Sequence, residues 1–224
     1  YNECCEDNYS IKKISNDIFN SLKNNYSHWM LKEIIEQPDT IRKAFNNGGR
    51  INDNIVKLGG LEDLKHIISY IEYVYIFGCG TSYNAALLGG HYFNESKQFV
   101  NVKIINACEF SNLDLANIKN KGKILCIFLS QSGETIDLYN CLKICRQESC
   151  ITMGIINKED SLIAREVHCG VYLNAGPEIS VASTKSFTSM LVVLKLVSMW
   201  FIKNQYANLD KITNLRLLPS ILTE

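Results

Sequence analysis

The segment KILCIFLSQSGET, residues 123–135, decides the fold. Its first seven residues are mostly apolar and β-prone without alternation, which is typical of a strand buried on both faces of a parallel sheet. Small and polar residues from Ser130 to Gly133 then interrupt this run, and helical spacing follows from Glu134. The segment therefore predicts a strand, a tight turn and a helix that begins near Gly133.

Four more short apolar runs follow the same pattern, and helix-length stretches separate them. Strands that alternate with helices predict a parallel sheet covered by helices on both faces. We therefore predict an α/β fold, namely a three-layer α/β/α sandwich with a five-stranded parallel sheet. The expected strands are 73–77, 101–105, 123–129, 151–156 and 170–173, and the expected helices include 83–93, 134–145 and 181–203.

The residues before about Gly60 predict an N-terminal helical segment. Apolar residues at helical spacing over 11–22 indicate a first helix, and a second is expected over 28–37. A third helix starts at Pro38, whose missing N–H costs nothing in a first turn, and ends at the glycines 48–49. We divide the chain into a helical lead-in at 1–60, an α/β domain at 61–206 and the start of a linker at 207–224.

The composition excludes some partners. The chain has 224 residues, 46% of them hydrophobic, and a formal net charge of +0. This balance removes the basic surface that non-specific nucleic-acid binding needs, so we expect no nucleic-acid partner. The longest apolar run, 190–202, contains Lys195 and is shorter than the ~20 residues that cross a bilayer. The polar N-terminus does not resemble a secretory signal. We expect a cytoplasmic protein with no membrane partner.

The nine cysteines include no Cys-x-x-Cys pair, so their spacing gives little support to a zinc site. We predict no metal, no cofactor, and reduced thiols rather than a disulfide framework. Cys126 lies inside an apolar run, where a free cysteine behaves as a small hydrophobe.

Ligands of doubly wound sheets bind at the carboxyl ends of the strands, so the loops after Phe77, Leu129 and Leu173 are the candidate binding loops. The loop at 130–135 offers three hydroxyls and one amide next to a helix amino end. An ordinary N-cap would account for any one hydroxyl. Four polar groups together favour an anion, and we interpret the loop as a phosphate cradle without a fixed cation.

The loop at 78–82 resembles the start of a dinucleotide fingerprint, but Tyr83 replaces the third glycine. We therefore expect neither NAD nor ATP, and Thr81 and Ser82 suit a smaller polar ligand. Cys79 would need a nearby base or cation to act as a nucleophile. Because the sequence shows neither, we favour a packing or ligand-contact role for Cys79.

A third polar cluster, at 181–185, opens the long apolar helix. Its Ser183 either caps that helix or reaches a sugar hydroxyl. For Lys185 we favour a structural ion pair, with a phosphate ligand or a Schiff-base lysine as alternatives. The histidines show no pairing and receive no catalytic role: His28, His66, His91 and His168.

Three segments together, 79–83, 129–135 and 178–188, resemble the first SIS (sugar isomerase) domain of the glutamine–fructose-6-phosphate aminotransferase family. Much of 28–38 is similar to the segment that precedes this domain, and the resemblance covers about 28–203. It implies the α/β sandwich and makes 61–206 the SIS domain. The implied ligands are fructose 6-phosphate, glucose 6-phosphate or glucosamine 6-phosphate, and a homodimer is implied as well.

Carried onto matching positions, the resemblance implies two sets of contacts. The phosphate contacts are Ser82, Ser130, Gln131, Ser132 and Thr135. The sugar contacts are Cys79, Gly80, Thr81, Val181 through its backbone, and Ser183.

The family's general base, ring-opening histidine and Schiff-base lysine lie in a second SIS domain and a C-terminal tail, so we assign no catalytic residue here. We expect the chain to bind substrate as the first SIS half of an isomerase unit without completing the reaction alone. The alternative is a stand-alone sugar-phosphate sensor or regulator, which the combination of ligand loops and no assigned catalytic residue also suits.

Overall fold

A computed structural model describes residues 23, 25–52 and 55–202 of the chain. Its main element is a five-stranded, all-parallel sheet with the strand order β4-β3-β5-β6-β7. The five predicted strands are confirmed, each within one residue of its expected bounds. They are β3 (Tyr73–Gly78), β4 (Asn101–Asn106), β5 (Ile124–Ser130), β6 (Ile151–Ile156) and β7 (Cys169–Tyr172).

Strand β5 lies in the middle of the sheet, and each of its seven residues is buried. Its neighbours β3 and β6 satisfy its backbone on both sides, which explains why its apolar run does not alternate. Phe128 pairs in register with Phe77 of β3, and their rings stack with centroids 4.8 Å apart. Cys126 is buried as a free thiol, as predicted.

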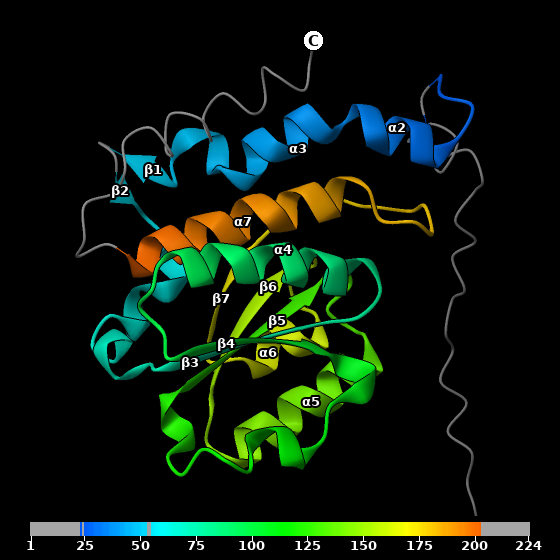
Figure 1. Ribbon diagram of the computed structural model, residues 1–224. Coiled ribbons are helices and arrows are strands. Elements are labelled where there is room, and N and C mark those ends of the chain that lie inside the picture. Colours follow the sequence, from blue (N-terminus) through cyan, green and yellow to red (C-terminus); the bar gives the residue numbers. More distant parts are fainter. Residues whose placement is uncertain (1–22, 24, 53–54, 203–224) are drawn as a thin grey trace, which may run out of the picture.

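Helices cover both faces of the sheet (Figure 1). One face carries α4 (Thr81–Glu95) and α7 (Lys185–Phe201), and the other carries α5 (Ile136–Gln147) and the short α6 (Leu162–Glu166). Two hydrophobic cores result, one on each face of the sheet. The predicted three-layer sandwich is therefore confirmed.

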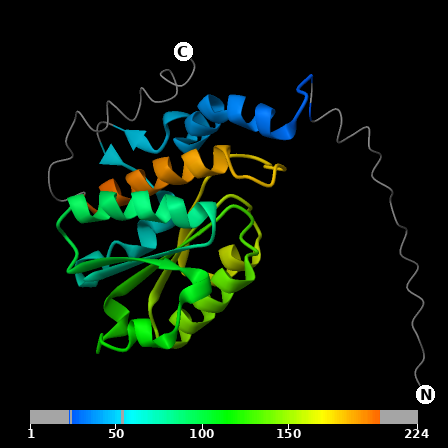
Figure 2. The same cartoon turned by 45° about the vertical axis from the view of Figure 1, so that its right-hand side comes forward.

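The lead-in helices lie alongside α7, on the side of α7 that faces away from the sheet (Figure 2). Helix α2 spans Trp29–Ile35, and α3 spans Gln37–Ala44 with Pro38 in its first turn. A 3₁₀ turn over Asn46–Gly48 then ends this helical part, as the glycine pair predicts. The helix expected over 11–22 and the segment 207–224 lie outside the described residues.

The predicted helical lead-in also contains a short sheet, which was not predicted. Strands β1 (Ile51–Asn52) and β2 (Ile55–Val56) form a small antiparallel pair there, with Ile51 opposite Val56. Both of these apolar side chains are buried in the core that contains α7, so burial of single side chains outweighs helical propensity. Two 3₁₀ helices, Gly59–Leu64 and Ile68–Tyr70, complete the connection to β3.

Two predicted helix starts are wrong. The helix expected from residue 134 begins at Ile136, because Gly133 has a φ of +67° and Thr135 is an extended N-cap residue with a ψ of 116°. The helix expected from residue 181 begins at Lys185. Both differences lengthen the loops at the carboxyl edge of the sheet.

Helix α7 is the most deeply buried helix and contains the longest apolar run. Its side chains contact the sheet, α4 and α3, and Trp200 is almost fully buried. Within the described part of the chain, no helix combines the length and apolarity that a membrane span requires.

The 3₁₀ helix Gly59–Leu64 approaches β7 so closely that only glycine fits at the point of contact. A Cβ at Gly60 would collide with the backbone carbonyl of Gly170, whereas a Cβ at Gly59 would meet nothing within 4 Å. We predict that Gly60→Ala lowers the free energy of unfolding by about 1–3 kcal/mol, because the backbones must separate. The matched variant Gly59→Ala should change it by less than about 1 kcal/mol.

Urea unfolding of the two variants checks this prediction. Equal midpoints for Gly60→Ala and the unmodified chain would show that the contact tolerates a methyl group.

Candidate functional site

The strand order reverses between β3 and β5, because the chain runs outward from β3 to β4 and then returns to the other side of β3. A crevice at the carboxyl ends of these two strands is where such sheets bind ligands. A pocket of about 210 Å³ lies there. Its lining residues are Cys79, Thr81, Ser82, Ser130, Gln131, Ser132, Thr135, Glu178, Ser180, Val181 and Ser183.

The structure thus brings together every predicted contact residue except Gly80, which is not part of the lining. Gly80 instead precedes α4 with a φ of +53°, a conformation that favours glycine. Two lining residues were missed, Glu178 and Ser180. Glu178 lies in the segment 178–188, which carries part of the family resemblance, so its carboxylate could have been predicted from the sequence to lie at the pocket.

The loop after β5 keeps its shape through its own hydroxyls. The Ser130 hydroxyl accepts from the N–H of Gly133 at 2.8 Å, and the Ser132 hydroxyl accepts from the N–H of Glu134 at 3.2 Å. A hydroxyl that accepts one bond keeps its proton to donate. Thr135 is the N-cap residue of α5 but makes no side-chain cap bond. These hydroxyls can therefore donate to a ligand in the pocket.

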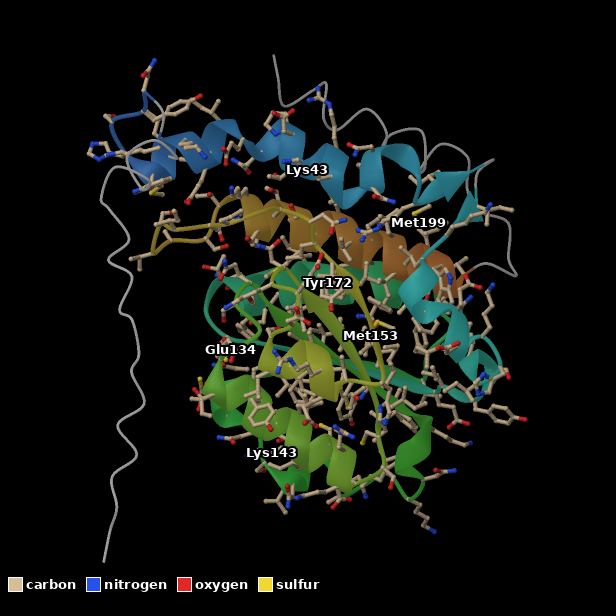
Figure 3. The ribbon with its side chains drawn as sticks, turned by 180° about the vertical axis from the view of Figure 1, so that it is seen from behind. Lys43, Glu134, Lys143, Met153, Tyr172 and Met199 are labelled. Atoms are coloured by element: carbon tan, nitrogen blue, oxygen red, sulfur yellow. The ribbon has the colours of Figure 1, made fainter. Side chains whose placement is uncertain are left out.

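Gly133 allows the tight turn in this loop. Beyond its positive φ, an added Cβ would collide with the side chain of Ser161. Glu134, labelled in Figure 3, is not part of the pocket lining. Its carboxylate accepts from the N–H of Leu162 at the start of α6 at 3.0 Å. The one acidic side chain of the loop therefore does not add negative charge to the pocket lining.

The loop after β3 brings backbone close to the same pocket. A Cβ at Gly78 would lie 2.6 Å from the backbone nitrogen of Tyr83, so the first turn of α4 can fold back only against glycine. Helix α4 starts at Thr81, and α5 starts at Ile136. The first N–H groups of each helix have no partner within the helix and carry partial positive charge. Two helix amino ends therefore adjoin the pocket.

The third helix amino end, that of α7, is already occupied by Glu178. Its carboxylate accepts from the N–H groups of Thr184 at 2.9 Å and Ser186 at 3.1 Å. Ser183 does not cap the helix, since Thr184 is the N-cap residue and the Ser183 hydroxyl donates to Glu178 at 3.0 Å. The pocket therefore has partial positive charge at the amino ends of α4 and α5 and a carboxylate at the amino end of α7.

The titratable side chains fit the roles favoured from sequence. Burial, with further contributions from Cys108 and Asp137, raises the pKa of Cys79 to about 11. A thiol with this pKa is protonated at neutral pH and is not an activated nucleophile. Lys185 is 3% exposed, and its ammonium pairs with Glu36 of the lead-in at 2.7 Å. The ion-pair interpretation of Lys185 is therefore confirmed, and Lys185 does not line the pocket.

Glu36 receives a second cation from the lead-in itself, the ammonium of Lys32. Burial alone would raise the pKa of Glu36, but the hydrogen bonds and charges of Lys185 and Lys32 outweigh it, and the pKa lies below its usual value. The carboxylate therefore stays ionised at neutral pH and joins α2 and α3 to the start of α7.

A second lead-in carboxylate, that of Glu33, holds the pocket loop. Glu33 is 1% exposed, and it accepts from the N–H of Ile179 at 2.6 Å and from both the N–H and the hydroxyl of Ser180. Since Ser180 and the neighbouring Val181 line the pocket, the lead-in shapes one of its walls. This role was missed from sequence, because Glu33 and Ile179 are 146 residues apart.

Comparison with known proteins agrees with this geometry. The family model of the SIS domain matches residues 67–199, more than half of the chain. The chain belongs to the SIS domain family. This match lies within the domain predicted at 61–206.

Several relatives have the full name of the family that the sequence resembles. A protein of Acanthamoeba polyphaga mimivirus called "Probable glutamine--fructose-6-phosphate aminotransferase [isomerizing]" is 41% identical over 78% of this chain and 28% of its own length. The human glutamine–fructose-6-phosphate aminotransferase [isomerizing] 2 is 34% identical over 96% of this chain and 32% of its own length. This SIS-domain chain therefore spans about a third or less of these relatives.

A solved structure shows the same relationship. The C-terminal domain of glucosamine-fructose-6-phosphate aminotransferase from Francisella tularensis superposes with a TM-score of 0.73 at 28% identity, over 89% of this chain and 55% of that one. The SIS domain described here is thus homologous to part of the C-terminal domain of that aminotransferase.

We predict that Glu33→Gln loosens the pocket wall, because the amide group of glutamine would present a donor to backbone donors. The free energy of unfolding should fall by about 1–3 kcal/mol, the typical effect of leaving a buried polar group unsatisfied. The amides of Ile179 and Ser180 should also exchange faster with solvent. Amide hydrogen exchange and urea unfolding measure the two effects.

Asp39→Asn provides the control, because Asp39 forms an exposed lead-in pair with Arg42. It should leave the exchange of the pocket loop unchanged. If the amides of Ile179 and Ser180 exchange at the same rate in Glu33→Gln and Asp39→Asn, Glu33 does not hold the loop.

Proposed function

We propose that this SIS domain binds a hexose 6-phosphate in the pocket between β3 and β5, as the first SIS half of an isomerase unit. The proposed ligands are fructose 6-phosphate, glucose 6-phosphate and glucosamine 6-phosphate. The observation that carries the proposal is a single pocket that combines two helix amino ends with a lining rich in hydroxyls. Membership of the SIS family and homology to the Francisella domain support it.

In this proposal the phosphate occupies the end of the pocket formed by the amino ends of α4 and α5. Its contacts are Ser82, Ser130, Gln131, Ser132 and Thr135. The described lining contains no lysine or arginine, so neutral donors and helix dipoles supply the attraction. Each hydrogen bond to a charged group contributes roughly 1.5–3 kcal/mol, which suits a metabolite that binds and leaves again.

The sugar then contacts the remaining predicted residues of the lining, namely Cys79, Thr81, Val181 and Ser183. The Val181 side chain is fully exposed, so we assign its contact to the backbone. Gly80 has a supporting role in this arrangement, since it sets the turn that presents Thr81. Glu178 also lines the pocket and accepts from the Ser183 hydroxyl, so in this proposal its carboxylate accepts from a sugar hydroxyl as well, which adds one contact to the predicted set.

The place of the chain in a larger enzyme also belongs to this proposal. The relatives are named as isomerizing aminotransferases, and this chain matches only about a third or less of their length. We therefore propose hexosamine synthesis for the parent enzyme and ligand binding for this domain. A cytoplasmic location and a homodimer remain expectations from the sequence and the family resemblance, and light scattering of the purified chain tests the second.

We predict that fructose 6-phosphate and glucosamine 6-phosphate raise the melting temperature of the chain and that free fructose does not, because a phosphate is needed to occupy the helix amino ends. Ser132→Ala and Thr135→Ala should each weaken binding by roughly ten- to hundredfold, since each removes a hydrogen bond to a charged group. Calorimetric titration measures the affinities.

Ser69→Ala is the matched control. Ser69 is exposed in the 3₁₀ helix before β3 and does not line the pocket. It should bind the sugar phosphates as the unmodified chain does. Undiminished affinity in both pocket variants would place the phosphate elsewhere.

We also predict that the chain alone does not convert fructose 6-phosphate to glucose 6-phosphate. Aldose–ketose isomerisation needs a base and an acid on opposite sides of the reacting carbons. The titratable groups in the described lining are Cys79, whose pKa is raised to about 11, and Glu178, which accepts hydrogen bonds from Ser183, Thr184 and Ser186.

An assay coupled to a glucose-6-phosphate dehydrogenase should therefore show no product above the blank. Conversion that disappears in Ser132→Ala would mean that this pocket alone completes the reaction.

A further inference from the structure

Three side chains that can bind a metal ion meet beside the sugar-phosphate pocket. They are Cys79 after β3, Cys108 after β4 and Asp137 in the first turn of α5. Their two sulfur atoms and a carboxylate oxygen all lie within 4.8 Å of one another. The Cys108 sulfur is 3.5 Å from a carboxylate oxygen of Asp137. Of these three residues, only Cys79 lines the pocket.

The fold holds these three positions together. Gly78 pairs with Asn106 in the sheet register, so Cys79 and Cys108 follow neighbouring strand ends. Cys108 lies in a 3₁₀ helix, Ala107–Glu109, that Asn106 caps by accepting from the N–H of Cys108. These contacts fix the backbone on both sides of the cluster.

Helix α5 is joined to the same 3₁₀ helix one turn beyond Asp137. The buried Cys141 thiol donates to the carbonyl of Ala107 at 3.3 Å. Asp137 is therefore held next to Cys108 by a contact that does not involve either of them, and the cluster does not depend on a flexible surface side chain alone.

The chemistry of the three groups matches a thiophilic divalent cation. Zn²⁺ binds thiolate sulfur at about 2.3 Å and carboxylate oxygen at about 2.0–2.2 Å, so tetrahedral ligands lie about 3.3–3.8 Å apart. Cys108 and Asp137 already have that separation. The other separations are within 4.8 Å and need a movement of about 1 Å at most.

The electrostatics of the cluster also favour a cation. None of the three side chains can carry a positive charge, so nothing within the cluster repels a cation. A bound divalent ion would stabilise thiolate sulfur and carboxylate oxygen directly.

We propose that Cys79, Cys108 and Asp137 form a binding site for a thiophilic divalent cation such as Zn²⁺, with the fourth position open to water. Cys108 and Asp137 are exposed, so solvent reaches the open position. The site shares Cys79 with the proposed sugar contacts but includes none of the phosphate contacts, and it does not rest on the proposed sugar binding.

Titration with Co²⁺, a spectroscopic substitute for Zn²⁺, tests the proposal in a phosphine-reduced buffer. The adjacent Cys4 and Cys5 lie outside the described residues, so every protein carries Cys4→Ser and Cys5→Ser. We expect one Co²⁺ per chain, a thiolate-to-cobalt charge-transfer band, and displacement of the cobalt by Zn²⁺. Competition with a chromophoric chelator then gives the Zn²⁺ affinity.

Cys108→Ser should abolish the band or reduce the affinity at least about tenfold, and Asp137→Asn should weaken binding by a similar factor while the band remains. Cys169→Ser is the matched control, because this thiol lies on β7 at the far edge of the sheet. It should bind Co²⁺ as tightly as the parent protein, which carries only Cys4→Ser and Cys5→Ser. Circular dichroism verifies that each variant is folded.

Absence of a charge-transfer band in the parent would overturn the proposal. So would equal cobalt binding by the parent and a folded Cys108→Ser variant, since the metal would then be held elsewhere.

Discussion

The parallel register of β3 and β5 is the constraint on which the site depends. Because both strands run the same way and are hydrogen-bonded neighbours, they end at one edge of the sheet, and each is followed by a helix. The amino ends of two helices, each with partial positive charge, therefore adjoin the same crevice. In the proposed complex, the side chains of the lining add hydrogen bonds to the attraction that these helix amino ends exert on a phosphate. Gly78 and Gly133 serve this arrangement, since larger residues would separate the turns from their neighbours.

The third wall of the pocket is built differently. The loop between β7 and α7 has no regular secondary structure, and its shape depends on side chains that come from other elements. Glu33 of α2 holds two of its backbone amides, and Asn157 after β6 donates to the carbonyl of Gly176 and accepts from the N–H of Ala175. The lead-in helices therefore help to shape the pocket, although they lie outside the sheet and outside the residues that match the family model.

The strands and the polar loops that follow them depend on local sequence pattern and were predicted correctly. Continuous apolar runs such as that of β5 identified the strands, and the topology then brought the polar loops after β3, β5 and β7 to one pocket. The exact start of α5 was missed, because the turn at Gly133 has a positive φ and lies close to Ser161, which is far from it in sequence. The β1–β2 pair was missed because the burial of Ile51 depends on α7, which is far away in sequence.

Long-range side-chain contacts were beyond prediction for the same reason. Glu33 and Glu36 occur in an ordinary helical pattern, and nothing nearby indicates that they reach Ser180 and Lys185. Cys108 and Asp137 are likewise unremarkable in sequence and meet only because a 3₁₀ helix packs against α5.

The carboxylate of Glu178 gives the pocket a polarity. It neutralises the amino end of α7, so one side of the pocket attracts an anion and the other does not. In the proposed complex, a sugar with a single phosphate can enter in only one orientation. A bisphosphate would bring its second dianion against Glu178, where like charges repel. Selectivity for monophosphates would then come from a helix cap rather than from the size of the pocket.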